Sequence, residues 1–136
     1  MPSHPYRALH RCLYPVQKFQ SDAERKLAII LDRESQKWFK PALGQFQIYY
    51  QEGIEQKEYL PDFVAETGEK IYLLEPKRQS EMEDEIVLAK REAAQTWCQH
   101  ASQHALTHSG KPWQYTLIPH DTINENMTLD GLLAQY

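Results

Sequence analysis

Apolar positions recur at helical spacing in the first regular part of the chain. The stretch S-D-A-E at Ser21 has the form of a capping box, in which Ser21 accepts from a backbone N–H and Glu24 reaches back. We expect a helix from Ser21 to about Trp38. Its expected inner face is made of Leu27, Ile30, Leu31 and Trp38.

Short β-prone runs follow, and we expect each of them to be a strand. Their ranges are 46–50, 59–65 and 70–75, and a last one covers 113–118. The second and third runs are joined by Glu66, Thr67, Gly68 and Glu69, a natural hairpin connection. Gly68 is expected to supply the positive φ of that turn.

A long helix is predicted between the third and fourth strands. It begins at Ser80, where S-E-M-E forms a second capping box, and runs to about Ala105. One face carries small apolar side chains, which let a helix lie close on a sheet. These residues are Val87, Ala94, Cys98, Ala101 and Ala105.

The predicted order of elements is α-β-β-β-α-β. A long crossover between the last two strands makes them parallel and the connection right-handed. We therefore expect an α/β fold, a mixed four-stranded sheet flanked by helices, within a single domain over 1–136. Residues 1–20, with Pro2, Pro5 and Pro15, are expected to be irregular. Residues 120–136 form a polar tail with a short terminal helix, so the core spans about 14–119.

Composition narrows the class of protein. Of the 136 residues, 41% are hydrophobic and 25% are charged, which is typical of a globular protein. No apolar run is long enough to span a bilayer, and the N-terminus lacks the apolar stretch of a signal peptide. The expectation is a cytoplasmic protein that does not engage a membrane.

The net charge of -4 argues against strong unaided binding to DNA. Proteins that bind DNA alone usually carry a basic surface, because neutralising phosphates supplies most of the non-specific affinity. Affinity for DNA would have to come from local basic patches, a metal or a partner. Arg78, Lys90 and Arg91 lie in such patches and are the candidate DNA-binding residues.

Candidate chemistry gathers at one end of the predicted hairpin. Alternation places Glu75 and Lys77 on one strand face, and the turn brings Asp62 to the same end as Glu75. Two adjacent carboxylates repel each other, and a hard divalent cation relieves that cost. A lysine beside them can polarise a water or stabilise negative charge. This combination indicates metal-assisted phosphodiester hydrolysis.

The pattern P-D, hairpin, E-x-K, in this order of elements, resembles the PD-(D/E)xK nuclease superfamily. The stretches FQSDAERKLA, KWF, YLPDFVAE, IYLLEPK and KREAAQTWC resemble the C-terminal endonuclease domain of type III restriction enzymes. That resemblance covers about 14–119. It implies a restriction-endonuclease-like core and a Mg²⁺- or Mn²⁺-dependent deoxyribonuclease.

The resemblance also implies individual roles. Asp62 would be the central metal ligand, with Glu75 and the backbone carbonyl of Pro76 as further ligands. Glu24 would complete the acidic cluster directly or through a water. Lys77 would position or activate the attacking water and stabilise the transition state, and Lys90 would contact phosphate or the site.

Two residues depart from the family pattern and keep a second interpretation open. Pro76 places a residue without an N–H in a central strand, and Arg78 stands where the type III domains often have glycine. The alternative is a catalytically inactive nuclease-fold module that binds DNA or a protein partner. Glu24 can also be explained by capping alone.

Partners are implied by what the sequence lacks. It contains no G-x-x-x-x-G-K-[ST] phosphate loop, so it has no ATP-driven motor of that type. We expect a nuclease module of a restriction or mobile-element system that works with a helicase, a translocase or a DNA-recognition subunit. A homodimer is a further possibility, and an RNA substrate is not distinguished from DNA.

Overall fold

A computed structural model of the chain describes residues 4–6, 11–12, 17–19 and 21–136. The first elements are β1 (His4–Tyr6), β2 (Gln17–Phe19), α1 (Asp22–Glu34), β3 (Lys37–Phe39), β4 (Tyr49–Glu52) and β5 (Glu55–Glu58). They are followed by β6 (Phe63–Glu66), β7 (Ile71–Lys77), α2 (Glu85–Thr107), β8 (Trp113–Pro119) and α3 (Leu129–Leu133). Short 3₁₀ turns cover Gln79–Glu81 and His120–Thr122.

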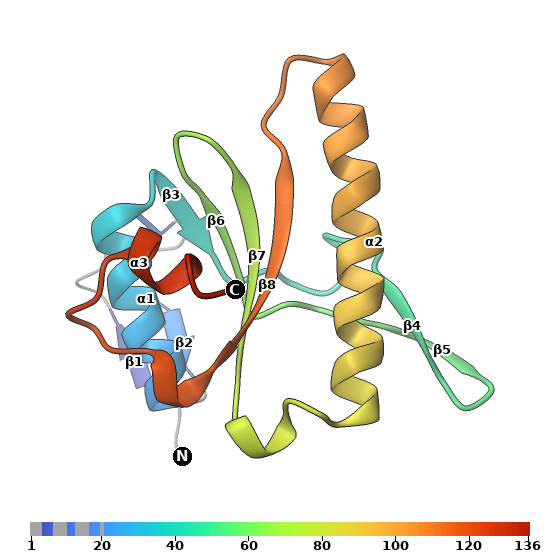
Figure 1. The fold of residues 1–136 in the computed structure, drawn as a ribbon, viewed down its shortest axis with the longest axis horizontal. Helices are drawn as coiled ribbons and strands as arrows, with labels where there is room; N and C mark the ends of the chain where they lie inside the picture. The colour runs from blue at the N-terminus through green and yellow to red at the C-terminus, as the bar shows by residue number, and fades with distance from the viewer. Residues whose placement is uncertain (1–3, 7–10, 13–16, 20) are drawn as a thin grey trace.

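The centre of the structure is a mixed four-stranded sheet with the strand order β3-β6-β7-β8. The β3–β6 and β6–β7 pairs are antiparallel, and the β7–β8 pair is parallel. Helix α2 makes the crossover between the two parallel strands (Figure 1). Together with α1 these elements follow the predicted order α-β-β-β-α-β, so the mixed α/β class is confirmed.

Helices cover both faces of the sheet. Helices α1 and α3 lie on one face and α2 lies on the other (Figure 1). Alternation along β7 places Leu74 in the core shared with α1 and α3, and Leu73 in the core shared with α2. The predicted face assignment of this strand is therefore correct, and Glu75 and Lys77 follow Leu73 by even steps.

Helix α1 begins as predicted but ends earlier. The Ser21 side chain accepts a hydrogen bond from the Glu24 N–H, which confirms Ser21 as the N-cap. The helix ends at Glu34 because Ser35 is extended, and the Ser35 hydroxyl donates to the Leu31 carbonyl. Trp38 is fully buried, but it lies on β3 rather than on the helix, so that boundary was wrong.

The expected strand over 46–50 does not belong to the main sheet. Its last two residues, Tyr49 and Tyr50, begin β4, which pairs with β5 in a separate hairpin that projects past α2 (Figure 1). Gly53 has a φ of 63° and forms the two-residue turn with Ile54. The highly polar β5 lacks apolar alternation, which explains why the sequence pattern missed it. Strand β3 takes the place predicted for this strand in the sheet.

The β6–β7 connection is a hairpin, as predicted, but glycine does not make its turn. Gly68 is not among the positive-φ residues of the described chain. The turn is held instead by Thr67, whose hydroxyl accepts from the backbone N–H groups of Glu69 and Lys70. A threonine side chain that bonds its own turn is a recognised alternative to glycine.

The N-cap of helix α2 lies four residues later than predicted. Ser80 lies in the 3₁₀ turn, and Asp84 is the N-cap, accepting from the N–H groups of Ile86 and Val87. The second capping box was therefore wrong. The stripe of small residues is confirmed, because Val87, Ala94, Cys98 and Ala105 are buried and Ala101 is half-buried.

Both ends of the chain differ from expectation. Within 1–20, the strands β1 and β2 pair antiparallel, so this segment is not wholly irregular, while Pro2 and Pro15 lie outside the described residues. The predicted terminal helix is α3, but the tail is not simply polar. Its apolar side chains, Ile123, Leu129, Leu132 and Leu133, complete the core beside α1.

Among the described residues, no helix is long and apolar enough to cross a membrane.

Candidate active site

The predicted acidic pair forms at the open end of the β6–β7 hairpin. Phe63 stands opposite Leu74 in the antiparallel register, so the preceding Asp62 faces Glu75. The Asp62 N–H donates to Glu75 Oε1 over 3.1 Å. The expectation that these two residues meet at one end of the hairpin is confirmed.

A cleft of about 410 Å³ opens at this place. The first turn of α1, the ends of β6, β7 and β8, and the 3₁₀ turn after β7 surround it. Its lining residues are Ser21, Glu24, Asp62, Glu75, Pro76, Lys77, Arg78, Glu81 and His120. The structure thus brings together all four predicted catalytic residues, Glu24, Asp62, Glu75 and Lys77, along with Pro76 and Arg78.

Glu75 is buried, and its two carboxylate oxygens have different surroundings. Oε1 accepts from the Tyr59 hydroxyl over 2.8 Å as well as from the Asp62 N–H. Oε2 lies 3.8 Å from Lys77 Nζ, an ion-pair distance that is too long for a hydrogen bond. Burial raises the pKa of Glu75, while the Tyr59 hydrogen bond and the Lys77 charge oppose that rise.

Asp62 is strongly perturbed by its surroundings in the cleft. Its pKa is raised to about 8, first by burial and then by the charges of Glu75 and Glu24. Its hydrogen bonds among the described residues use its backbone N–H and carbonyl, not its carboxylate. The carboxylate therefore needs either a proton or an added cation to be stable at neutral pH.

Glu24 is also buried in the cleft, but a lysine already neutralises it. Lys40 Nζ lies 2.7 Å from Glu24 Oε1 and 3.4 Å from the Asp62 carbonyl oxygen. The same ammonium lies 4.5 Å from the centroid of the Phe63 ring. Ser21 therefore caps α1 by accepting from the Glu24 backbone N–H, while the Glu24 carboxylate pairs with Lys40.

Pro76 does not end β7. The strand continues to Lys77, with Pro76 opposite Ile118 of β8. The pairing with β6 stops at Leu74, so β7 has only one neighbouring strand at this position. A residue without an N–H costs fewer ladder hydrogen bonds there than in the middle of a sheet. Lys77 is half-buried and lies between Glu75 and Glu81, at 3.8 Å and 4.0 Å.

The three candidate DNA-binding residues lie in different places. Arg78 is exposed at the rim of the cleft. Lys90 on α2 lies over the rings of Tyr50 and Tyr59, at 5.5 Å and 5.6 Å from their centroids. Arg91 is exposed on the same helix and does not line the cleft.

Several cleft or supporting residues were missed in the sequence. Lys40 follows β3, and Tyr59 precedes β6, and each reaches the acidic residues from outside the P-D…E-x-K pattern. Tyr115 on β8 bonds Tyr59. His120 lines the cleft, and burial and the nearby Arg78 lower the pKa of its imidazole. Only the placement of Tyr59 and Tyr115 in apolar strand segments hinted that their hydroxyls would need buried partners.

The cleft offers few protein ligands, which suits a magnesium ion better than an ion that needs many protein ligands. No group of three or more histidine, cysteine, aspartate or glutamate side chains is placed to hold a metal within the part of the chain that the structure describes. The Glu24 carboxylate is paired with Lys40. Among the predicted metal ligands, the Asp62 carboxylate and Glu75 Oε2, beside Pro76, are the carboxylate groups that remain. Mg²⁺ keeps several waters and is usually bound through one or two carboxylates.

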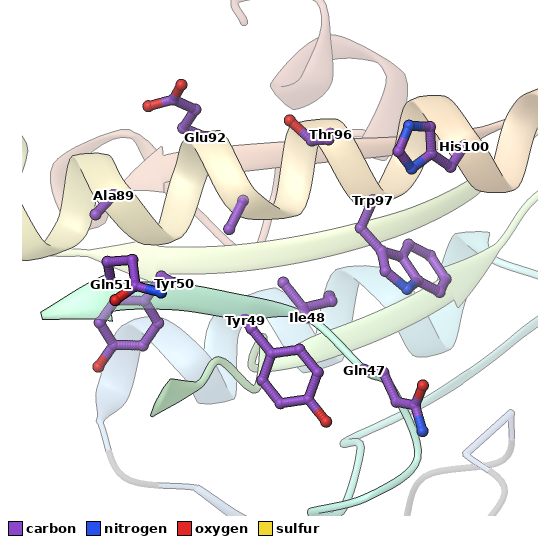
Figure 2. A pocket seen from close by; sticks show the side chains of 11 residues that line it. Gln47, Ile48, Tyr49, Tyr50, Gln51, Ala89, Glu92, Thr96, Trp97 and His100 are labelled. Atoms are coloured by element: carbon purple, nitrogen blue, oxygen red, sulfur yellow. The ribbon is translucent and has the colours of Figure 1, made fainter. Parts of the chain in front are cut away.

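Another groove, of about 530 Å³, runs between α2 and the segment that leads into β4 (Figure 2). Figure 2 shows Trp97 reaching down from the helix, with Ile48, just before β4, and Tyr49, on β4, below it. Its ionisable lining residues are Tyr49, Tyr50, Glu92 and His100. With a single carboxylate and no lysine or arginine in its lining, it lacks the charge pattern of the acidic cleft.

No family model, no curated protein and no solved structure matches the chain. The chemistry of the acidic cleft is therefore the basis for assigning a function.

Proposed function

We propose that this chain is a Mg²⁺- or Mn²⁺-dependent DNA endonuclease domain with a restriction-endonuclease-like core. One observation carries the proposal: Asp62, without a side-chain hydrogen-bond partner among the described residues, faces Glu75, and Lys77 shares the cleft with both. A buried glutamate and a half-buried aspartate beside a lysine match the needs of phosphodiester hydrolysis. Such a reaction requires a cation, a polarised water and a positive charge near the phosphate.

Each residue has a role in this proposal. Asp62, Glu75 Oε2 and the carbonyl of Pro76 would hold the ion. When bound, Mg²⁺ or Mn²⁺ supplies a Lewis acid and lowers the pKa of a water. Lys77 orients that water or stabilises the negative charge that develops on the phosphate oxygens. Its ammonium lies 3.8 Å from Glu75 Oε2 and lines the same cleft as Asp62.

Glu24 supports the site through Lys40 rather than as a ligand in direct contact. The Lys40–Glu24 pair, at 2.7 Å, places an ammonium against the Asp62 carbonyl oxygen and fixes the end of β6 against α1. A water between Glu24 and the ion remains compatible with this arrangement. The role predicted for Glu24 is thus narrowed to support through a water or through Lys40.

Binding of DNA is proposed to be weak without a partner. The net charge is -4, and the cleft has few basic residues: Lys77 and Arg78 line it, and Lys40 is already paired with Glu24. Counterion release from a handful of phosphate contacts gives low affinity at physiological salt. The domain would therefore act in a restriction or mobile-element system beside a helicase, a translocase or a DNA-recognition subunit.

The test is nicking of supercoiled plasmid at high protein concentration with Mg²⁺ or Mn²⁺. Asp62→Asn and Lys77→Ala proteins, purified in parallel, control for contaminating nuclease, and Lys57→Ala on the β4–β5 hairpin is a matched lysine control. We expect nicking by the wild type and by Lys57→Ala, and none by the two site variants. Nicking that persists in Asp62→Asn and Lys77→Ala would refute this active site.

The alternative is an inactive nuclease-fold module that binds DNA or a protein partner. A specific observation favours it: Lys40 neutralises Glu24, and Tyr59 and Lys77 partly stabilise Glu75, all without any ion. Calorimetry with Mg²⁺ separates the two proposals. A protein that binds no Mg²⁺ at millimolar concentration at pH 8 would be the inactive module.

A further inference from the structure

Two buried tyrosines stand behind Glu75. The Tyr59 hydroxyl lies 2.8 Å from Glu75 Oε1 and 2.9 Å from the Tyr115 hydroxyl. Both tyrosines are almost fully buried, and their rings meet edge to face with centroids 6.1 Å apart. We call Tyr115, Tyr59 and Glu75 Oε1 the tyrosine relay. Neither tyrosine lines the acidic cleft, whereas Glu75 does.

The direction of the hydrogen bonds in the relay follows from the donors available. Glu75 Oε1 already accepts from the Asp62 N–H, and a second donor there must be the Tyr59 hydroxyl, since Oε1 has two in-plane acceptor positions. A phenol has one hydrogen, so Tyr59 has none left for Tyr115. Tyr115 therefore donates to Tyr59, and the chain of hydrogen bonds runs one way, from Tyr115 to Glu75.

The relay bonds one carboxylate oxygen of Glu75, Oε1, and leaves Oε2 free to bind a ligand. Both acceptor positions of Oε1 are filled by groups of the protein. Among the described residues, Oε2 has one polar contact, Lys77 Nζ at 3.8 Å, and so keeps its lone pairs for a ligand in the cleft. Lys90 lies over the Tyr59 ring and helps to hold that ring in place.

We infer that Tyr59 and Tyr115 are positioning residues that restrict Glu75 to a single metal-binding oxygen, Oε2, and so make the site select Mg²⁺ over Ca²⁺. The inference rests on the proposed metal-dependent function. Mg²⁺ demands near-octahedral geometry with single oxygen atoms as ligands, whereas Ca²⁺ accepts both oxygens of a carboxylate and six to eight ligands in total. Because Oε1 is already occupied, Glu75 can bind Mg²⁺ well through Oε2 alone but is a poor ligand for Ca²⁺.

The test is calorimetric titration of metal-free protein with Mg²⁺ and, separately, with Ca²⁺. Tyr59→Phe removes the donor to Oε1 and frees that oxygen. We expect its Kd for Mg²⁺ to rise about tenfold, the usual effect of losing an outer-shell partner, and its Kd for Ca²⁺ to change less than about threefold. Tyr115→Phe leaves the Tyr59–Glu75 bond in place and should shift the ratio in the same direction by less.

Tyr72→Phe is the matched control, because Tyr72 is on β7 but packs on the α1 side of the sheet. It should leave both Kd values unchanged. Circular dichroism checks that each variant is folded, and if Tyr59→Phe does not fold, the Mg²⁺/Ca²⁺ ratio of Tyr115→Phe decides.

The outcomes separate the inference from the proposed function. A fall in the Mg²⁺/Ca²⁺ ratio of affinities supports the relay. Equal weakening of both ions means a merely structural role for the tyrosines and overturns it, as does no change in either ion. A wild-type protein that binds neither ion overturns the metal-dependent function itself, and the relay falls with it.

Discussion

Replacing Asp62 with asparagine should stabilise the metal-free protein, and the gain should depend on pH. In the folded chain the pKa of Asp62 is about 8, against an ordinary value of 3.8. Between these two values the folded state holds a proton that the unfolded state has lost. The free energy of unfolding of the wild type therefore falls as the pH rises through this window. Asparagine resembles the protonated carboxyl and carries no such loss.

The size of the effect follows from the width of the window. Each pH unit between 5 and 8 costs up to 1.36 kcal/mol, which gives at most about 4 kcal/mol between pH 5 and pH 9. The cleft is open to water, which screens part of the repulsion from Glu75 and Glu24. We therefore expect the advantage of Asp62→Asn over the wild type to grow by about 2 to 4 kcal/mol between these pH values.

Urea unfolding in the presence of a chelator, at pH 5, 7 and 9, measures this difference. Asp130→Asn is a matched control, since Asp130 is exposed on α3 and should give a constant difference. A gap between Asp62→Asn and the wild type that does not change with pH would refute the reasoning, because it would mean that Asp62 is well solvated. If the difference in unfolding free energy grows with pH and added Mg²⁺ then removes it, the cation relieves the repulsion at Asp62.

Three further predictions concern the cleft and the core. Because a proton must leave Asp62 before a cation binds, the affinity for Mg²⁺ should rise by up to about tenfold per pH unit between pH 6 and 8; calorimetry that finds a constant Kd would contradict this. Lys40→Met leaves Glu24 buried without its partner and should cost about 1–3 kcal/mol in urea unfolding, most of it regained in the double variant with Glu24→Gln. If the double variant is no more stable than Lys40→Met, the unpaired Glu24 carboxylate is not the cause of the lost stability. Trp38→Ala empties a fully buried site on β3 and should cost about 3–5 kcal/mol, whereas an end-of-helix Trp38 would cost far less.

The acidic pair was predictable because two local rules placed it. Alternation in β7 fixes the face of Glu75 and Lys77, and a short hairpin fixes which end of β6 meets them. Neither rule depends on distant parts of the chain. Asp62 and Glu75 are only 13 positions apart, and the hairpin between them sets the strand register that brings them together.

The supporting residues were not predictable in this way. Lys40 follows β3 and Tyr115 lies on β8, and the local pattern connects neither to the site. The pairing of β3 and β8 within the sheet and the packing of α1 on it bring them near. Trp38 was assigned to the helix because its spacing from Leu31 is helical, whereas one serine, Ser35, ends the helix first. Helix ends are decided by single residues, and strand order is decided by tertiary contacts.

The β6–β7 hairpin also has a consequence for the order in which the chain folds. Only the four residues between Glu66 and Ile71 separate its strands, whereas β8 can join β7 only after the whole crossover through α2 has formed. Contacts with short sequence separation form faster than distant ones, and the N-terminal parts of a chain leave the ribosome first. We expect a newly made chain to pair Asp62 with Glu75 early, and to acquire Tyr115 and His120 behind and beside that pair only once its last strand has docked.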